Sequence, residues 1–259
     1  MRSLPALVLL LAASTLVVPA QAAADEMCLY ASPTILDPDG GTVEGTTGDD
    51  VIVVGPDVTV LAGAGVDRVC VTGTDEADYV AVRDAEYLDV ALGGGYDTLH
   101  LDAVGHGTGS IDPGADGAYL QLTPRRSVYL HLGEDAMYFD GNSNYVVTGI
   151  WDVTASTKRV RLLGDAGPNH LRALDQSCKV TIEGGRGKDW LAVGANTTEV
   201  PAVTCNTRRA PELIGDGGND LLVGFKRNDR LFGGPGRDTA KGGFGKDTCR
   251  AEVKKSCER

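Results

Sequence analysis

The C-terminal part of the chain repeats a glycine-rich block every nine residues. Four such blocks begin at Gly215, Gly224, Gly233 and Gly242. A fixed period of this length indicates a repeat architecture, in which each unit stacks on its neighbours. Each block bends the chain at glycines, ends on an aspartate and continues into a short apolar or β-prone segment. The pattern therefore predicts short strands that alternate with tight turns.

The spacing of the blocks also predicts which turns are neighbours. If two nonapeptides form one coil, turns that are 18 residues apart stack on the same edge of the molecule. Asp220 is then expected over Asp238, and Asp229 over Asp247. Turn carbonyls and carboxylates are hard oxygen ligands, which suit Ca²⁺ better than Zn²⁺. The stacked turns are therefore candidate calcium sites.

The pattern Gly-Gly-x-Gly-x-Asp-x-apolar-x resembles the RTX nonapeptide repeat, also called the haemolysin-type calcium-binding repeat. The resemblance implies a right-handed parallel β-roll, with each ion between two stacked turns and held by glycine-turn carbonyls and both aspartates. In the regular blocks it implies these metal-site residues: Gly215, Gly217, Gly218, Asp220, Asp229, Gly233, Gly234, Gly236, Asp238, Gly242, Gly243, Gly245 and Asp247. The block at Gly224 departs from the pattern, because Phe225, Lys226 and Arg227 stand where the turn favours small residues. We therefore expect a weaker site at Asp229 and Asp247.

Looser copies of the unit occur upstream at irregular spacing. Residues 184–191 match the whole pattern, and residues 45–52 have a variant opening. The upstream candidate ligands are Gly184, Gly185, Gly187, Asp189, Asp50, Asp67 and Asp97. Two weaker copies place Asn169 and Asp78 at the aspartate position. An ordinary Gly-Asp turn is the alternative for each upstream copy.

These observations predict an all-β protein, a right-handed parallel β-roll or β-solenoid that is degenerate in its N-terminal half. β-Branched alternations such as residues 51–54 and 128–132 separate the copies, and no long segment has a helical period. The predicted organisation is a signal peptide (1–24), a degenerate solenoid with insertions (25–210), regular repeats (211–250) and a disulfide-stapled tail (251–259).

The N-terminus has the pattern of a secretory signal. Arg2 precedes an apolar run over residues 4–18, and residues 19–22 supply a small-x-small cleavage motif. No other segment is apolar enough to span a bilayer. We therefore expect a secreted protein, with association with the cell envelope as a further option.

Six cysteines in an exported chain favour disulfides. Sequence alone leaves all fifteen pairings of six cysteines open. Proximity favours Cys249 with Cys257, Cys178 with Cys205, and Cys28 with Cys70.

Charge is distributed unevenly along the chain. Residues 25–155 carry 23 acidic and 4 basic side chains, whereas residues 156–259 carry 13 acidic and 19 basic ones. The acidic half can attract divalent cations, and the basic half could contact a polyanion or simply keep stacked turns soluble. Nucleic acid is not expected as a partner, because aromatic residues are sparse and no recognition motif occurs.

The sequence favours a non-enzymatic protein that binds Ca²⁺ and folds outside the cell. Neither a His-Glu-x-x-His zinc motif nor a Gly-x-Ser-x-Gly elbow is present. Two alternatives remain, namely a calcium-dependent adhesin that binds cell-wall or extracellular polysaccharide, and a carbohydrate-active enzyme on the acidic half. The carboxylates that could serve such an enzyme are Asp84, Glu86, Asp89, Glu134, Asp135 and Asp140. A calcium-free solenoid is the third possibility.

Overall fold

The computed structural model describes residues 31–102, 107–123, 127–141, 143–195 and 203–257. The predicted signal peptide and Cys28 lie outside these residues. Regular structure in the described part is almost entirely β, with one short 3-10 helix, η1 (Leu132–Glu134).

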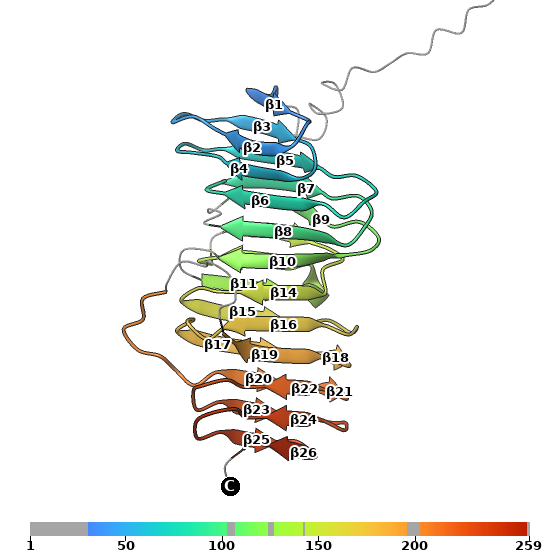
Figure 1. Cartoon of the computed structure of the whole chain (residues 1–259), viewed down its shortest axis with the longest axis vertical. Coiled ribbons are helices and arrows are strands. Elements are labelled where there is room, and N and C mark those ends of the chain that lie inside the picture. The colour runs from blue at the N-terminus through green and yellow to red at the C-terminus, as the bar shows by residue number, and fades with distance from the viewer. Residues whose placement is uncertain (1–30, 103–106, 124–126, 142, 196–202, 258–259) are drawn as a thin grey trace, which may run out of the picture.

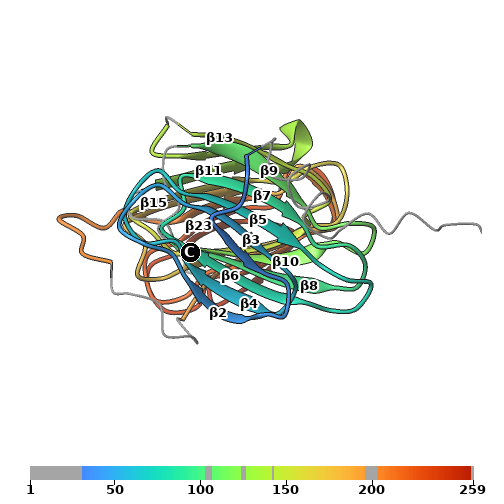
Figure 2. The ribbon, with the colours of Figure 1, turned by 90° about the horizontal axis from the view of Figure 1, so that it is seen from above.

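The strands form two large sheets that face each other along the whole stack (Figures 1 and 2). Sheet A has 13 strands in the order β1 (Ile35–Asp37), β3 (Val51–Val54), β5 (Arg68–Thr72), β7 (Tyr87–Ala91), β9 (Thr108–Asp112), β13 (Asn144–Val147), β12 (Ala136–Phe139), β11 (Ser127–His131), β15 (Arg159–Leu163), β17 (Lys179–Glu183), β20 (Glu212–Ile214), β23 (Arg230–Phe232) and β25 (Thr248–Arg250). Sheet B has 11 strands in the order β2 (Gly41–Glu44), β4 (Val58–Leu61), β6 (Tyr79–Arg83), β8 (Asp97–Asp102), β10 (Ala118–Thr123), β14 (Asp152–Ala155), β16 (His170–Leu174), β19 (Trp190–Gly194), β22 (Leu221–Val223), β24 (Thr239–Lys241) and β26 (Val253–Lys255). A third sheet pairs two short turn segments, β18 (Arg186–Gly187) and β21 (Gly217–Gly218).

The topology confirms the predicted parallel β-solenoid. Each coil contributes one strand to sheet A and the next to sheet B, and neighbouring coils pair in parallel. Both sheets run through the acidic and the basic half of the chain without interruption, as the colours from blue to red in Figure 1 show. The two halves therefore share one core.

One insertion breaks the regular alternation. Strands β11, β12 and β13 form an antiparallel meander within sheet A, so β12 is antiparallel to both of its neighbours. In sheet B, β10 pairs directly with β14, so the chain forms three strands of sheet A between two neighbouring strands of sheet B. The insertion supplies large core side chains, including Met137, Phe139 and Tyr145, and the rings of the last two lie 5.6 Å apart. The meander thus fills its own part of the core.

The core becomes thinner toward the C-terminus. Strands in the N-terminal coils commonly bury two or more apolar side chains, such as Val58 and Val60 in β4. From β20 to β24 each three-residue strand buries one, and these are Leu213, Leu222, Leu231 and Ala240. Since buried apolar area is the main favourable term in folding, the C-terminal coils depend more on interactions within their turns.

Two of the predicted disulfides are confirmed. Cys178 is bonded to Cys205, and Cys249 is bonded to Cys257. The first joins the residue before β17 to the segment that leads into β20, and the second ties the last coil together. The prediction for Cys28 with Cys70 involves a residue outside the described part of the chain.

Candidate metal centre

Aspartates stack in ladders where the turns lead into the strands. We call the turn positions before sheet B strands the B edge, and those before sheet A strands the A edge. On the B edge, the backbone N–H of Asp220 donates to Asp238 Oδ1 at 2.9 Å. On the A edge, the N–H of Asp229 donates to Asp247 Oδ1 at 2.8 Å. The 18-residue spacing therefore predicted both neighbours correctly.

The B edge ladder is longer than the regular repeats. The N–H of Asn169 donates to Asp189 Oδ1 at 2.8 Å, and the N–H of Asp189 donates to Asp220 Oδ1 at 2.9 Å. At the other end, the N–H of Asp238 donates to Glu252 Oε2 at 2.8 Å. Five successive coils thus place an Asp, Asn or Glu side chain in one continuous row.

Shorter ladders occur in the N-terminal half. Asp50 donates its N–H to Asp67 Oδ1 at 3.0 Å on the A edge. Asp78 donates its N–H to Asp97 Oδ1 at 2.8 Å on the B edge. The upstream copies are therefore built like the regular repeats, and they are more than isolated Gly-Asp turns.

Glycine is required where each carboxylate folds back against its own turn. A Cβ on Gly184 would lie 2.5 Å from Asp189 Oδ2 and 2.8 Å from the carbonyl oxygen of Gly215 in the next coil. Gly215 makes the same close approach to Asp220 Oδ2 and the carbonyl oxygen of Gly233. Each such position brings a carboxylate oxygen and a carbonyl oxygen of the neighbouring coil together. Two converging oxygen acceptors are an arrangement that a hard cation can stabilise.

Many of these carboxylates keep one buried oxygen without a hydrogen-bond partner among the described residues. The oxygens are Asp67 Oδ2, Asp97 Oδ2, Asp189 Oδ2, Asp220 Oδ2, Asp229 Oδ1, Asp238 Oδ2 and Asp247 Oδ2. A buried, unpaired polar atom costs about 1–3 kcal/mol, and a charged one costs more. These buried carboxylate oxygens therefore lack a positively charged partner, and as hard oxygen ligands they fit Ca²⁺.

Burial changes the acidity of the stacked aspartates. Burial, with a smaller contribution from the neighbouring carboxylates Asp220 and Asp247 respectively, raises the pKa values of Asp189 and Asp229 to about 6. Burial also raises the pKa values of Asp220, Asp67 and Asp97. Without a bound cation, the ionised form of these buried aspartates is thus less favourable than it is in water.

The site relies on backbone oxygens as well as side chains. Within the described residues, no three or more His, Cys, Asp or Glu side chains cluster in a way that could hold a metal ion. The remaining ligands would be turn carbonyls. Gly234 illustrates how the turns allow this, because it has φ +99° and a Cβ at this position would collide with the carbonyl oxygen of Asp216. The other predicted glycines lie in the corresponding turns of the same two edges.

The irregular block at Gly224 has a distinct role. Arg227, at a glycine position of the repeat, forms an ion pair with Asp175 at 3.0 Å and donates to the carbonyls of Ser177 and Arg209. Its charge also opposes the rise that burial causes in the pKa of nearby Asp229. In the A edge row, the register neighbour of Asp229 in the preceding coil is Pro211. Proline has no backbone N–H, so Asp229 Oδ1 does not receive the hydrogen bond that the other rows contain. The positive charge of Arg227 gives the expected weakness of the 229/247 site a physical reason.

Sequence reasoning missed Glu252 as a member of the ladder. It follows Asp238 by 14 residues instead of 18, and its turn contains no glycine. The hydrogen bond from the N–H of Asp238 lowers the pKa of Glu252. The acidic residue just before the strand Val253–Lys255 was the available signal.

Comparison with known families supports this geometry. The family model described as RTX calcium-binding nonapeptide repeat (4 copies) matches residues 223–252. Residues 223–252 are RTX repeats. The matched segment contains Asp229, Asp238, Asp247 and Glu252, and the ladder continues upstream of the RTX match to Asn169. No curated protein shows significant similarity to the chain. In the described part of the chain, no helix has the length and apolar character to cross a membrane.

Proposed function

We propose that the protein is exported and that Ca²⁺ held between the stacked B edge turns completes its folding outside the cell. The observation that carries the proposal is the row of buried Oδ2 atoms of Asp189, Asp220 and Asp238. Each would contribute its free oxygen, together with the adjacent carbonyls of Gly215 and Gly233. The bound ion would supply the positive charge that these oxygens lack.

Export is part of the proposal and is supported by two features. The N-terminal sequence has the pattern of a secretory signal. The Cys178–Cys205 and Cys249–Cys257 disulfides suit an oxidising compartment. In the cytoplasm, where free Ca²⁺ is scarce, repulsion between ladder carboxylates would keep the thin C-terminal coils open.

We further propose that the protein has no catalytic activity. Two carboxylates considered for catalysis have ordinary structural roles, because Asp89 accepts from Ser110 Oγ at 3.1 Å and Asp140 accepts from Ser127 Oγ at 2.9 Å. These contacts connect neighbouring strands of sheet A. They support a structural use of the acidic half.

A calcium titration of the mature, disulfide-intact protein tests the proposal. Far-ultraviolet circular dichroism should show a cooperative gain of β signal as Ca²⁺ rises, whereas Mg²⁺ should have little effect. Ca²⁺ at ten times its dissociation constant adds about 1.4 kcal/mol of stability per site, so several sites can decide whether the coils fold. An identical folded spectrum and thermal midpoint in calcium-depleted and calcium-saturated buffer would overturn the proposal.

A further inference from the structure

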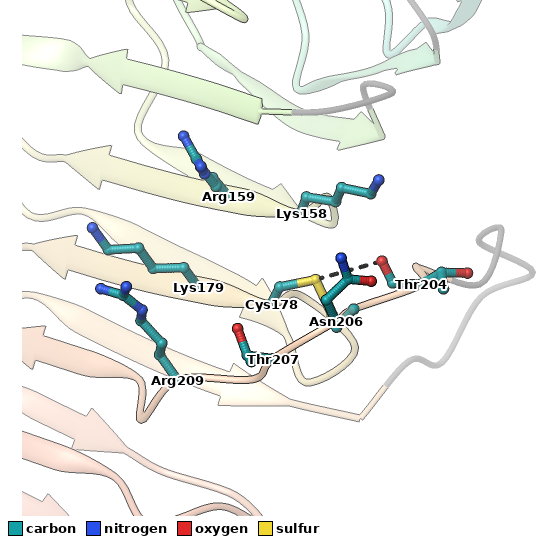
Figure 3. Close-up of a pocket in the computed structure, with 9 residues that line it drawn as sticks. Lys158, Arg159, Cys178, Lys179, Thr204, Asn206, Thr207 and Arg209 are labelled. Atoms are coloured by element: carbon teal, nitrogen blue, oxygen red, sulfur yellow. Dashed lines mark hydrogen bonds between the residues drawn. A yellow bond between two sulfur atoms is a disulfide. The ribbon is translucent and has the colours of Figure 1, made fainter.

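Four basic side chains surround a cavity beside the Cys178–Cys205 disulfide (Figure 3). Its volume is about 450 Å³, and its cations are Lys158, Arg159, Lys179 and Arg209. Arg159 and Lys179 are directly paired on β15 and β17. The N–H of Arg209 donates to the carbonyl of Cys178 at 2.9 Å, which places Arg209 beside them. Figure 3 shows Arg159, Lys179 and Arg209 projecting to the same side.

These cations lack partners of opposite charge among the described residues. Other arginines on the same sheet do have them, since Arg161 pairs with Glu183 and Arg230 with Glu212, both at 3.3 Å. Lys158, Arg159, Lys179 and Arg209 are all exposed and make no ion pair within the described part of the chain. Their charge is therefore available to a ligand.

The A edge also loses its carboxylates in these coils. The position of Asp229 in the strand register is occupied in the three preceding coils by Pro211, Val180 and Val160. Both valines are buried. A negatively charged ligand here thus avoids the ladder aspartates that would repel it elsewhere along this edge.

The cavity continues into a second hollow of about 220 Å³ on the outer face of sheet A. The two share Arg159 and Lys179. The second hollow is also lined by Tyr129 and Tyr138, whose rings lie 5.8 Å apart, and Arg161 lies 5.2 Å from the centre of the Tyr129 ring. We call the two hollows together the basic groove. It crosses β11, β15 and β17 and is aromatic at one end and cationic at the other.

We propose that the basic groove binds a linear acidic polysaccharide. Cations on adjacent strands recur about every 4.8 Å along the stack, so they can follow a chain that carries a regular series of carboxylates or sulfates. The ring of Tyr138 offers an apolar surface to a sugar ring. Single-stranded nucleic acid is less well matched, because it needs successive aromatic stacking platforms and this groove has one tyrosine pair, already contacted by Arg161.

Binding assays on the mature protein in calcium-containing buffer test this proposal. The probes are polygalacturonate for carboxylates, dextran sulfate for sulfates, neutral dextran, and single-stranded DNA. The double variant Arg159→Ala/Lys179→Ala should weaken binding to at least one acidic polysaccharide by at least about tenfold, which corresponds to about 1.4 kcal/mol. The tighter of the two acidic probes identifies the anionic group.

The matched control is Lys241→Ala/Lys255→Ala. These lysines are also exposed and directly paired on adjacent strands, β24 and β26, but they belong to sheet B. The control removes the same charge and should change affinity less than about twofold. Equal weakening by both double variants would overturn the site, and so would DNA or neutral dextran binding as tightly as the acidic polysaccharides. Arg209→Gln, outside the sheets, should also weaken binding, and it keeps the test decisive if the groove double variant misfolds.

This groove is separate from the B edge ladder. If a variant loses polysaccharide binding but keeps a normal calcium titration, the result therefore concerns only the groove proposal. If calcium causes no change in the circular dichroism spectrum while polysaccharide binding is retained, the result contradicts only the metal proposal.

Discussion

The two oxygens of each ladder aspartate have different environments. In Asp220, Oδ1 accepts the N–H of Asp189, whereas Oδ2 is buried and has no partner among the described residues. The first oxygen helps to hold the coils in register, and the second is a candidate metal ligand. An asparagine keeps an accepting oxygen without the negative charge, and at the start of the row the side-chain oxygen of Asn169 accepts the N–H of Asp165 in its own turn at 2.9 Å.

Substitution of Asp220 by Asn should have opposite effects with and without calcium. In calcium-depleted buffer the variant should be at least as stable as the parent, because a buried carboxylate that costs energy is removed. In calcium, the midpoint of folding should move to about tenfold higher Ca²⁺ or more, a loss of about 1.4 kcal/mol. Titrations followed by circular dichroism measure both.

Asp229→Asn is the matched comparison on the A edge. Arg227 already supplies positive charge near Asp229, so its calcium midpoint should shift by less than about threefold. If Asp229→Asn shifts the midpoint as much as Asp220→Asn does, the assignment of the stronger site to the B edge is wrong.

The raised pKa values of Asp189 and Asp229 predict an inverted pH dependence. Both rise from their ordinary range to about 6 on burial, so the folded state binds more protons than the unfolded state between about pH 4 and 6. In calcium-depleted buffer, stability should be greatest below about pH 4 and should fall as pH rises through 6. Saturating calcium should remove this fall, because bound ions favour the ionised carboxylates. Thermal midpoints across this range, measured with and without calcium, provide the check. A calcium-free midpoint that rises from pH 4 to 7 would contradict the burial of ionised ladders.

At the level of elements, the turns need close backbone approach as well as positive φ. Gly234 and Gly41 share a φ of +99°, but a Cβ on Gly234 would collide with the carbonyl of Asp216, whereas one on Gly41 would meet nothing within 4 Å. Both alanine variants should pay about 1 kcal/mol or more for the backbone conformation. Gly234→Ala should lose about 1–3 kcal/mol more, because the collision forces stacked turns apart. Chemical denaturation in saturating calcium measures the difference, and equal losses would mean that the turns can separate freely.

Much of the repeat segment was readable from the sequence, because a nine-residue period fixes which turns meet. The same logic could not place Asp189 next to Asp220, since 31 residues separate them although β19 and β22 pair directly in register. The antiparallel strand β12 had no distinct signal either, because alternating apolar residues fit either direction of pairing. The basic groove depends on Arg209, which only the fold brings beside Arg159 and Lys179.

At the scale of the whole molecule, stability should differ along the stack. N-terminal coils bury more apolar side chains per strand than the C-terminal coils do. In calcium-depleted buffer, amide hydrogens of β20 to β26 should therefore exchange much faster than those of β3 to β10. Calcium should slow C-terminal exchange by about a hundredfold, which corresponds to two sites at about 1.4 kcal/mol each. Hydrogen exchange followed by mass spectrometry measures this, and uniform protection along the chain would contradict it.

The row of ladder residues on the B edge is divided into two blocks at the level of the meander β11–β13. In the B edge register, Ala118 and Trp151 stand between Asp97 and Asn169, in the coils on either side of the insertion. Neither side chain can accept a backbone N–H or bind an ion, so occupancy of one block is not passed to the other along the row. We therefore expect an ion bound near the C-terminus to favour binding at the immediately neighbouring turns, whereas the coils before residue 118 should respond independently.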